Sequence, residues 1–386
     1  MTRRHAVVAG AGIGGLTAAV ALSRRGWRVT VLERAAELSA AGAGIVLAPN
    51  GLRALEAIGA PAADWAGEAA VADMGIRRPD GRWLNRGDSA ALVARYGRAP
   101  LAVHRPALAE ALAGALPAGT VRFGAAVTEV AGTATAHPLV RTPDGELAAD
   151  LVVAADGIHS ALRRRHFPGH PGLHHSGEAA WRTVVPGTGL PGLAVAETWG
   201  RGERFGVVPL ADGQVYVYGT ALAPEGSSYA DHRAELLRRF GAWHDPIPAL
   251  LERIDPAKVL HHDLHDLAAP LPRFHEGRLA WLGDAAHAMT PNLGQGGCQA
   301  IEDAVVLARL VGDGDARSDV PAALAAYTRA RHRRTNAIAL RARRAGRAVR
   351  LTHPLAAAAR DLLVRVTPVR VAHRALDDLF TGVTFV

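Results

Sequence analysis

The 386-residue chain has little cysteine, almost no lysine and no long uninterrupted apolar run. Its one cysteine, Cys298, excludes an internal disulfide and a thiolate metal cluster, which fits a reducing cytoplasm. No stretch of about 18 uninterrupted apolar residues occurs, so we expect no membrane span. Lys258 is the one lysine among 44 basic residues, and so strong a preference for arginine is typical of a GC-rich genome.

What is present indicates a large globular protein. With 49% apolar residues, a chain of this length can bury a sizeable core in two domains or in one large composite. The net charge is +8, and the densest arginine run, residues 329–350, has helical spacing. A solvated or salt-bridged helix face is the favoured interpretation of this run over a nucleic-acid surface, so we expect no nucleic-acid partner.

The N-terminus, "MTRRHAVVAGAGIGGLTAAVAL", begins like a secretory signal, with basic residues followed by apolar ones. Its glycine spacing favours a different interpretation. Gly10, Gly12 and Gly15 separate a strand-like run, residues 6–9, from an Ala/Leu-rich helical segment, residues 16–25. A signal helix needs no such glycines, whereas a dinucleotide site does.

Each part of this G-x-G-x-x-G unit has a physical role in binding a dinucleotide. Gly10 permits the tight turn, Gly12 lets the backbone approach a pyrophosphate, and Gly15 lets the helix pack on the strand. The phosphates then lie at the positive N-terminus of the helix. The second strand, residues 29–32, ends at Glu33, which can accept hydrogen bonds from a ribose hydroxyl. Because an acidic residue here disfavours a 2′-phosphate, the sequence predicts a site for FAD or NAD in preference to one for NADP.

The chain does not continue with further β-α-β units, as a nicotinamide dehydrogenase would. Short turn-rich pieces such as "GIRRPDGRWLNRG" follow, so other sequence interrupts the nucleotide-binding sheet. The strand-then-glycine pattern returns twice, where residues 151–155 run into Asp156 and where residues 279–282 run into Gly283 and Asp284. An aspartate at the carboxyl end of such a strand lies at the ligand-binding edge of the sheet. For Asp156 alone, a helix N-cap is an equal alternative.

Three ordered motifs resemble those of the flavoprotein aromatic hydroxylases, the single-component FAD monooxygenases with the para-hydroxybenzoate hydroxylase fold. They are "GAGIGG", "DGIHSALR" and "GDAAHAMTPNLGQGGCQAIEDA", and the last is closest to urate hydroxylases and zeaxanthin-type epoxidases. The resemblance implies an α/β fold with a discontinuous Rossmann-like FAD-binding domain, residues 1–70, 98–168 and 276–320. A substrate domain with a mostly antiparallel β-sheet, residues 71–97 and 169–275, would interrupt it, and C-terminal helices, residues 321–386, would follow.

The resemblance also implies which residues hold FAD. In the family, the residues matching Glu33 and Arg34 bind the adenosine end, and the arginine matching Arg105 contacts FAD. The aspartate matching Asp284 binds the ribitol, and the one matching Asp156 is linked to both FAD and NAD(P)H binding. The full set of expected cofactor residues is Gly10, Gly12, Gly14, Gly15, Glu33, Arg34, Arg105, Val127, Asp156, Asp284, Gly294, Gln295, Gly296 and Gly297.

The second glycine-rich helix entrance, near Gly296, would serve the other end of the same cofactor. Reduced flavin is anionic at its pyrimidine side, and the backbone N–H groups of residues 294–297 together with the helix dipole would stabilise that charge. Side chains at these glycine positions would prevent the flavin ring from approaching the backbone. The neighbouring Cys298 is expected to be a small buried packing residue.

The middle of the chain is assigned to the substrate, because 9 of the 19 aromatic residues lie between residues 169 and 274. The stretch "ERFGVVPLADGQVYVYGTAL" predicts a hairpin turning at residues 211–213. Arg204 and Tyr216 have the positions of the arginine and tyrosine that urate hydroxylases use at the substrate, although an ordinary half-buried sheet face is an equal alternative. Asn292 is a third candidate, but the urate enzymes carry an aspartate there, which counts against urate. The predicted register places on one face Arg204, Gly206, Val208, Tyr216, Tyr218 and Thr220.

Two histidine pairs raise the possibility of a metal site. Because no carboxylates stand at ligand spacing beside them, we expect surface-loop residues instead, and a flavin makes a metal unnecessary. The pairs are His174, His175, His261 and His262.

Together these features predict a cytoplasmic FAD monooxygenase, monomeric or homodimeric. In the family, NADH or NADPH reduces the flavin, O₂ adds at its C4a position, and the hydroperoxide hydroxylates an electron-rich aromatic or heteroaromatic molecule. No second G-x-G-x-x-G occurs, so the nicotinamide is expected to bind transiently.

Other activities stay open. The same flavin chemistry could epoxidise an isoprenoid-like alkene, or the chain could be a flavin-loaded protein that sequesters a planar ligand without turnover. A flavin halogenase shares the N-terminal fingerprint but needs a W-x-W-x-I-P stretch and a catalytic lysine. Here "WRTVVP" lacks the second tryptophan, and Lys258 lies outside any such motif.

Overall fold

The chain begins with a β-α-β unit built around the first glycine-rich turn. In the computed structural model, which describes residues 3–39, 43–62, 73–314 and 319–381, β1 (His5–Ala9) leads into α1 (Ile13–Arg24) and then β2 (Arg28–Leu32). β1 is fully buried and pairs in parallel with β2. The helix begins at Ile13 rather than at the predicted Leu16, so Gly14 and Gly15 belong to its first turn.

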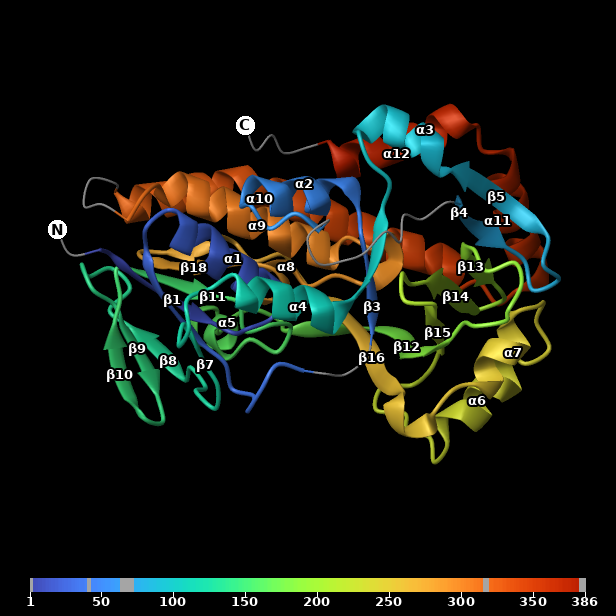
Figure 1. Ribbon diagram of the computed structural model, residues 1–386, viewed down its shortest axis with the longest axis horizontal. Helices are drawn as coiled ribbons and strands as arrows, with labels where there is room; N and C mark the ends of the chain where they lie inside the picture. The colour runs from blue at the N-terminus through green and yellow to red at the C-terminus, as the bar shows by residue number, and fades with distance from the viewer. Residues whose placement is uncertain (1–2, 40–42, 63–72, 315–318, 382–386) are drawn as a thin grey trace.

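A parallel sheet forms the core of the first lobe (Figure 1). The order of its strands is β17 (His275–Glu276), β18 (Leu279–Trp281), β11 (Leu151–Ala154), β1, β2 and β7 (Val121–Arg122), and only β17 runs antiparallel to its neighbour. Three segments far apart in the chain therefore lie side by side in β1, β11 and β18. Because the carboxyl ends of parallel strands meet at one edge, the three predicted turns after these strands meet there as well.

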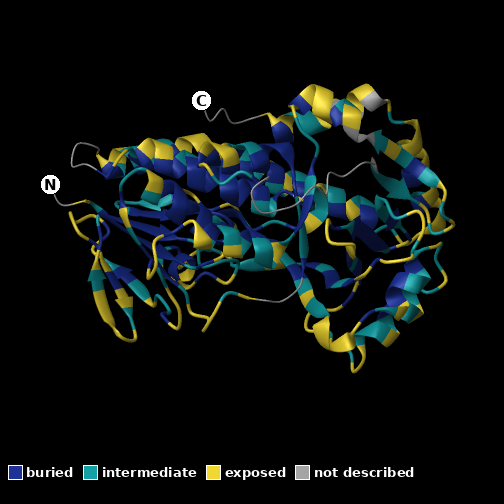
Figure 2. Ribbon diagram, viewed as in Figure 1, coloured by how far each residue is buried: buried dark blue, intermediate teal, exposed yellow. Residues whose placement is uncertain are grey.

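Helices cover this sheet and bury its apolar residues. α1 packs against α4 (Arg105–Gly114) and α9 (Gly296–Val311), and α9 also packs against α2 (Pro49–Ala57). α1 can approach α9 closely because its buried positions include Ala18, Ala19 and Ala21. Figure 2 shows the resulting burial concentrated in the first sheet, α1 and α9.

The second lobe contains a seven-stranded sheet that is mostly antiparallel, as predicted, with one parallel pair between β13 and β4. Its order is β16 (Leu260–Leu267), β12 (Leu173–Pro186), β15 (Gln214–Leu222), β14 (Glu203–Pro209), β13 (Val195–Trp199), β4 (Asp73–Arg77) and β5 (Trp83–Asp88). One face packs on α6 (His232–Phe240) and α7 (Ile247–Glu252) through a cluster that includes Trp181, Phe205 and Phe240. The opposite face is turned to the first lobe.

The described chain also contains shorter elements beside the two main sheets. β3 (Gly44–Leu47) pairs with β6 (Leu101–His104), and β3 runs between the lobes in Figure 1. The others are α3 (Ser89–Tyr96), β8 (Glu129–Ala131), β9 (Leu139–Thr142), β10 (Gly145–Ala148), α5 (Ala161–His166), η2 (Pro256–Lys258), α8 (Asp284–His287) and η3 (Pro291–Leu293).

Three C-terminal helices complete the fold. α10 (Val320–Val349) runs along the molecule from the first lobe to the second and is followed by α11 (Pro354–Val366) and α12 (Val369–Phe380) (Figure 1). The arginine run lies on α10 and is salt-bridged, as predicted: Arg343, for example, lies 2.6 Å from Asp266 of β16. Its helical spacing did not indicate that Arg331 would be fully buried. In the part of the chain that the structure describes, no helix has the length and apolarity needed to cross a membrane.

Candidate active site

The turn after β1 leaves open space at the N-terminus of α1. Gly10 has φ +105°, which favours glycine, and a Cβ on Gly15 would overlap the Gly10 carbonyl oxygen. Both glycines are therefore needed for the turn itself. A Cβ on Gly12, by contrast, would meet no atom within 4 Å. The unpaired N–H groups of the first turn of α1 face this space, which suits a pyrophosphate.

Glu33 lies at the carboxyl end of β2, beside this turn. Its Oε2 accepts a hydrogen bond from the Ala11 N–H at 2.7 Å, and its Oε1 accepts one from the Ala35 N–H at 2.9 Å. Two backbone N–H groups thus hold the carboxylate in place. Arg34 follows Glu33, and Val127 lies half-buried in the loop between β7 and β8. The adenosine-binding role that the resemblance implies for Glu33 and Arg34, and the place of Val127 among the cofactor residues, stay predictions.

The turn after β11 places Asp156 before the N-cap of α5, so the N-cap interpretation is wrong, and its role in cofactor binding stays a prediction. Its Oδ2 accepts a hydrogen bond from the Leu162 N–H at 3.3 Å, while the N-cap of α5 is Ser160. Its Oδ1 is buried without a hydrogen-bond partner. The buried Arg163 links this turn to the next one, because its guanidinium donates to the Asp284 and Ala285 carbonyl oxygens at 3.2 Å each.

The turn after β18 places a carboxylate at the same sheet edge. Gly283 has φ +58°, and Asp284 is exposed to the crevice although protein surrounds it. This enclosure raises the pKa of Asp284, while His287, Arg105 and Arg163 act in the opposite direction. Its side-chain oxygens can accept hydrogen bonds from hydroxyl groups in the crevice.

The second glycine-rich entrance opens α9 toward the same space. Gly294 has φ +61°, and a Cβ there would meet no atom within 4 Å. A Cβ on Gly297 would lie 2.8 Å from the Ile45 side chain of β3. As predicted, α9 begins at Gly296, so the N-terminus of a long helix points its free N–H groups into the crevice.

A cavity of about 440 Å³ joins these turns to the seven-stranded sheet. It brings together, among the predicted site residues, Gly12, Gly14, Arg105, Arg204, Tyr216, Asp284, Gly294, Gly296 and Gly297. The cavity is also lined by Gly44, Arg182, Glu197, Tyr218 and Thr220.

The hairpin register that the sequence predicted is confirmed. Arg204 lies opposite Thr220, Gly206 opposite Tyr218 and Val208 opposite Tyr216, on the face turned to the cavity. Arg204 is only 2% exposed, and its Nε donates to Thr220 Oγ1 at 3.0 Å. The Tyr216 ring packs on β3, where a Cβ on Gly44 would lie 2.5 Å from its Cγ. Burial raises the pKa of Tyr216, so its hydroxyl stays protonated.

Two predicted site residues point their side chains elsewhere. Asn292 does not line the cavity, and its Nδ2 donates to Thr290 Oγ1 at 2.9 Å and to the Ala342 carbonyl of α10 at 3.1 Å. This amide joins η3 to α10, so the structure does not place it at the substrate. Gln295 is buried, and its Oε1 accepts from the amides of Asn50 and Gln299. Only its backbone belongs to the helix entrance.

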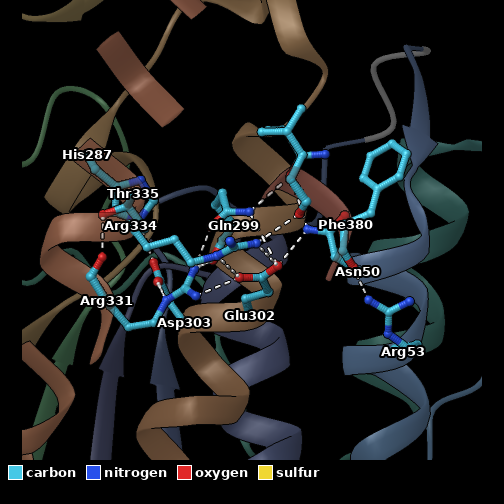
Figure 3. Close-up of polar contacts among 12 residues, drawn as sticks. Asn50, Arg53, His287, Gln299, Glu302, Asp303, Arg331, Arg334, Thr335 and Phe380 are labelled. Atoms are coloured by element: carbon cyan, nitrogen blue, oxygen red, sulfur yellow. Dashed lines mark hydrogen bonds and ion pairs between the residues drawn. The ribbon is translucent and has the colours of Figure 1, made fainter. Parts of the chain in front are cut away.

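Behind the helix entrance lies a buried polar network that sequence analysis missed (Figure 3). The Arg331 guanidinium of α10 lies 2.6 Å from both Glu302 and Asp303 of α9, and all three side chains are fully buried. Asp303 also accepts from His287 of α8 at 2.5 Å, and Glu302 accepts from Asn50 of α2 at 2.6 Å. The network therefore fixes the helices that carry the second glycine entrance.

The location predicted for the two histidine pairs is wrong. They were expected in surface loops, but His174 and His175 lie in β12, and His261 and His262 lie in β16. His174 is paired with Asp266 at 3.0 Å. Within the described ranges, no group of three or more His, Cys, Asp or Glu side chains is arranged to hold a metal ion.

The buried position predicted for Cys298 is confirmed. Its side chain is fully buried, and burial raises the pKa of its thiol to about 12. The sulfur accepts from the Ala48 N–H at 3.4 Å, so it packs α9 against the start of α2.

These residues fit FAD as the cofactor that the resemblance implies. The space beside Gly12 and the free N–H groups of α1 suit a pyrophosphate, Asp284 suits ribitol hydroxyls, and the start of α9 suits an anionic ring edge. The unpartnered Oδ1 of Asp156 adds a second acceptor beside the crevice.

Asp284→Ala is expected to lose most bound FAD. Each hydrogen bond from a hydroxyl to this carboxylate contributes about 1.5–3 kcal/mol, so the affinity should fall about 10- to 150-fold. FAD titration of the apoprotein measures the change. Asp313→Ala is the matched control, because Asp313 is exposed beyond the other end of α9 and pairs with Arg25. Unchanged FAD affinity in a folded Asp284→Ala protein would remove this residue from the site.

Comparison with known proteins points to flavoproteins throughout. Residues 3–342 match the family described as FAD binding domain. The aurachin C monooxygenase/isomerase of Stigmatella aurantiaca is 38% identical over 363 residues, with 93% of each chain covered. The FAD-dependent urate hydroxylase of Klebsiella pneumoniae is 34% identical over 352 residues, with 88% of each chain covered. The crystal structure of Klebsiella pneumoniae HpxO complexed with FAD and uric acid superposes with a TM-score of 0.89 at 31% identity, covering 98% of this chain and 97% of that one.

Proposed function

The chain belongs to the FAD binding domain family of flavoprotein aromatic hydroxylases, and from this premise we propose that it uses NAD(P)H and O₂ to hydroxylate an aromatic or heteroaromatic small molecule. Its relatives are FAD-dependent monooxygenases and hydroxylases, so it is an FAD monooxygenase. The proposal goes beyond this family activity in naming NAD(P)H as the electron donor and an aromatic or heteroaromatic ring as the substrate.

One observation carries the proposal: the same cavity has flavin-binding turns at one end and a polar, aromatic sheet face at the other. Gly12, Asp284 and Gly296 line the first end, and Tyr216 and Tyr218 line the second. A planar molecule lying on the sheet face would therefore sit directly against the ring of the cofactor. A protein that only stored flavin would not need this polar, aromatic sheet face opposite the flavin-binding turns.

FAD, when bound, would supply the redox chemistry, with NAD(P)H as the reductant and O₂ as the oxidant, one oxygen atom going to the substrate and the other leaving as water. The chain contributes binding, orientation and charge. The N–H groups at the start of α9 would stabilise negative charge on the bound flavin ring. The sheet face and β3 exclude water and hold the substrate.

A screen tests this function. Purified protein is loaded with FAD and offered aromatic and heteroaromatic compounds, and stimulated NAD(P)H oxidation is measured together with product mass. The expected result is a compound that accelerates NAD(P)H consumption and gains one oxygen atom. If every ring compound that binds leaves NAD(P)H consumption at its basal rate, the protein is a flavin-loaded binder and the proposal fails.

Tyr216→Phe is expected to keep FAD but to uncouple NAD(P)H oxidation from hydroxylation. Removing one neutral hydrogen bond to the substrate costs about 0.5–1.5 kcal/mol, so product per NAD(P)H should fall roughly 2- to 10-fold while hydrogen peroxide rises. Arg204→Ala should act in the same direction, but it also leaves Glu197 without its partner, so the tyrosine variant is cleaner.

Tyr229→Phe provides the control for this experiment. Tyr229 packs against Trp181 in the apolar cluster on the opposite face of the sheet, away from the cavity. Its coupling should equal that of the wild type. Unchanged coupling in Tyr216→Phe as well would assign Tyr216 to packing alone.

A further inference from the structure

Glu197 is the carboxylate that the sheet presents to the substrate end of the cavity, and sequence analysis did not identify it. It lies on β13 opposite Gly206 of β14, and Gly206 lies opposite Tyr218 of β15. In an antiparallel sheet such directly opposed residues share a face. Glu197, Gly206 and Tyr218 therefore form one row across three strands on the cavity side.

Gly206 allows the two outer members of this row to meet. A Cβ at this position would overlap the Tyr218 ring, so the ring crosses β14 where no side chain stands. The Tyr218 hydroxyl then donates to Glu197 Oε1 at 2.5 Å. Burial, with Glu197 beside it, raises the pKa of Tyr218 well above its usual value, so the hydroxyl remains a donor to the carboxylate. The Trp199 indole N–H holds Glu197 Oε2 at 2.8 Å.

The same carboxylate neutralises the arginine expected at the substrate. Arg204 Nη1 lies 3.3 Å from Glu197 Oε1. Burial lowers the pKa of Arg204, but Glu197 and its neighbours outweigh this effect and raise it, so the guanidinium stays charged. Of the two partners, Arg204 is 2% exposed and the Glu197 side chain is 27% exposed. A ligand therefore meets the carboxylate of this ion pair rather than its guanidinium.

Resting on the proposed function, we infer that the substrate is an uncharged heteroaromatic ring whose N–H donates to Glu197, and that Glu197 discriminates against anionic rings. A ring N–H beside an acceptor-only carboxylate forms a charge-assisted hydrogen bond. A carboxylate or enolate at the same place would face like charge in an enclosed site. Arg182, on β12 opposite Tyr218, and Arg105 are further cations that line the cavity and would favour an anion, so the relative affinities of neutral and anionic rings decide between the two effects.

Binding of matched ring compounds to the FAD-loaded protein tests the inference without turnover. The probes are 4(1H)-quinolone, which is neutral and carries a ring N–H beside a conjugated carbonyl, its N-methyl derivative, and salicylate. Perturbation of the flavin spectrum reports the Kd of each. We expect 4(1H)-quinolone to bind about 10- to 150-fold more tightly than the N-methyl compound, which lacks the donor. Salicylate should bind more weakly than 4(1H)-quinolone.

The substitution Glu197→Gln keeps the shape of the side chain and removes its negative charge. We expect it to shift the ratio of the salicylate Kd to the quinolone Kd by at least about tenfold in favour of salicylate. Glu203→Gln is the matched control, because Glu203 stands on the opposite face of the same sheet, near Arg239 of α6, and should keep the wild-type ratio. The comparison of the two quinolones needs no variant, so it decides the question even if Glu197→Gln loses FAD.

Each outcome is decisive. Equal affinity for both quinolones, or tighter binding of salicylate to the wild type, overturns the inference. Hydroxylation of salicylate with quinolone inert would uphold the proposed function and refute Glu197 as its selectivity residue. A third outcome is that 4(1H)-quinolone binds with the expected dependence on its N–H, but no ring compound stimulates NAD(P)H oxidation. This would uphold recognition of the ring N–H by Glu197 and refute the proposed function.

Discussion

Gly12→Val should give a folded protein that retains no FAD. The backbone of Gly12 has φ −71° and ψ 173°, an extended conformation that valine adopts readily. Its Cβ would meet no protein atom within 4 Å, so nothing in the fold opposes the substitution. The branched side chain would fill the space at the N-terminus of α1 that the pyrophosphate needs. The loss should therefore be specific to the cofactor.

The flavin absorbance of the purified variant, with circular dichroism and thermal unfolding of the apoprotein, measures this effect. Gly114→Val is the control, because Gly114 at the end of α4 is equally open and lies outside the cavity. It should keep a full complement of FAD. Gly15→Val is expected to misfold instead, since its Cβ would overlap the Gly10 carbonyl oxygen. Stoichiometric FAD in Gly12→Val would show that the pyrophosphate does not approach this turn.

The flavin end of the cavity was readable from the sequence because backbone geometry dominates it. Gly10, with φ +105°, occupies a backbone conformation that few other residues adopt, and the glycines at the start of α9 mark a helix entrance, so both turns can be recognised in the sequence. The hairpin register was predictable for a similar reason. A three-residue turn fixes every pair along two strands, and it correctly placed Arg204 opposite Thr220.

The substrate end was less predictable because its contacts join strands that are not neighbours in the chain. Glu197 faces Tyr218 across β14, and nothing in the local sequence of β13 indicates that partner. The only signal was Gly206, whose missing side chain leaves room for the tyrosine ring. Asn292 was placed at the substrate by its position in a motif. The long-range hydrogen bond of its amide to Ala342 on α10 turns it away.

The buried charges on α9 and α10 were missed for a physical reason. Helical spacing describes which face a residue occupies, and an arginine run is usually solvated. Arg331 instead lies on the face of α10 that packs on α9, where it meets Glu302 and Asp303 (Figure 3). Burial of an arginine requires acidic partners on another helix, and a pattern within one helix cannot reveal them.

Arg331→Ala should destabilise the protein by about 3–5 kcal/mol at neutral pH, because it leaves two fully buried carboxylates without their shared guanidinium. Arg344→Ala, an exposed position on the same helix, should change stability by less than about 0.5 kcal/mol. Urea unfolding of both variants measures the difference, and equal stability would mean that the network contributes nothing to the fold.

The effect of Arg331→Ala should also depend on pH. Burial alone would raise the pKa of both carboxyls. His287 and Arg331 outweigh it at Asp303, and Arg331 and Arg334 outweigh it at Glu302, so both pKa values are lowered from 3.8 and 4.5. This stabilisation of the wild type is therefore complete above those values and is lost as the pH falls below them. In Arg331→Ala the two carboxylates lose the guanidinium that they share and keep only His287, Asn50 and Arg334 as partners, so their pKa values should rise and protonation should stabilise the variant. The gap in stability between the two proteins should accordingly narrow as the pH is lowered from about 7 toward about 4. A gap that stays constant over this range would show that the lost stability comes from packing of the arginine side chain and not from its charge.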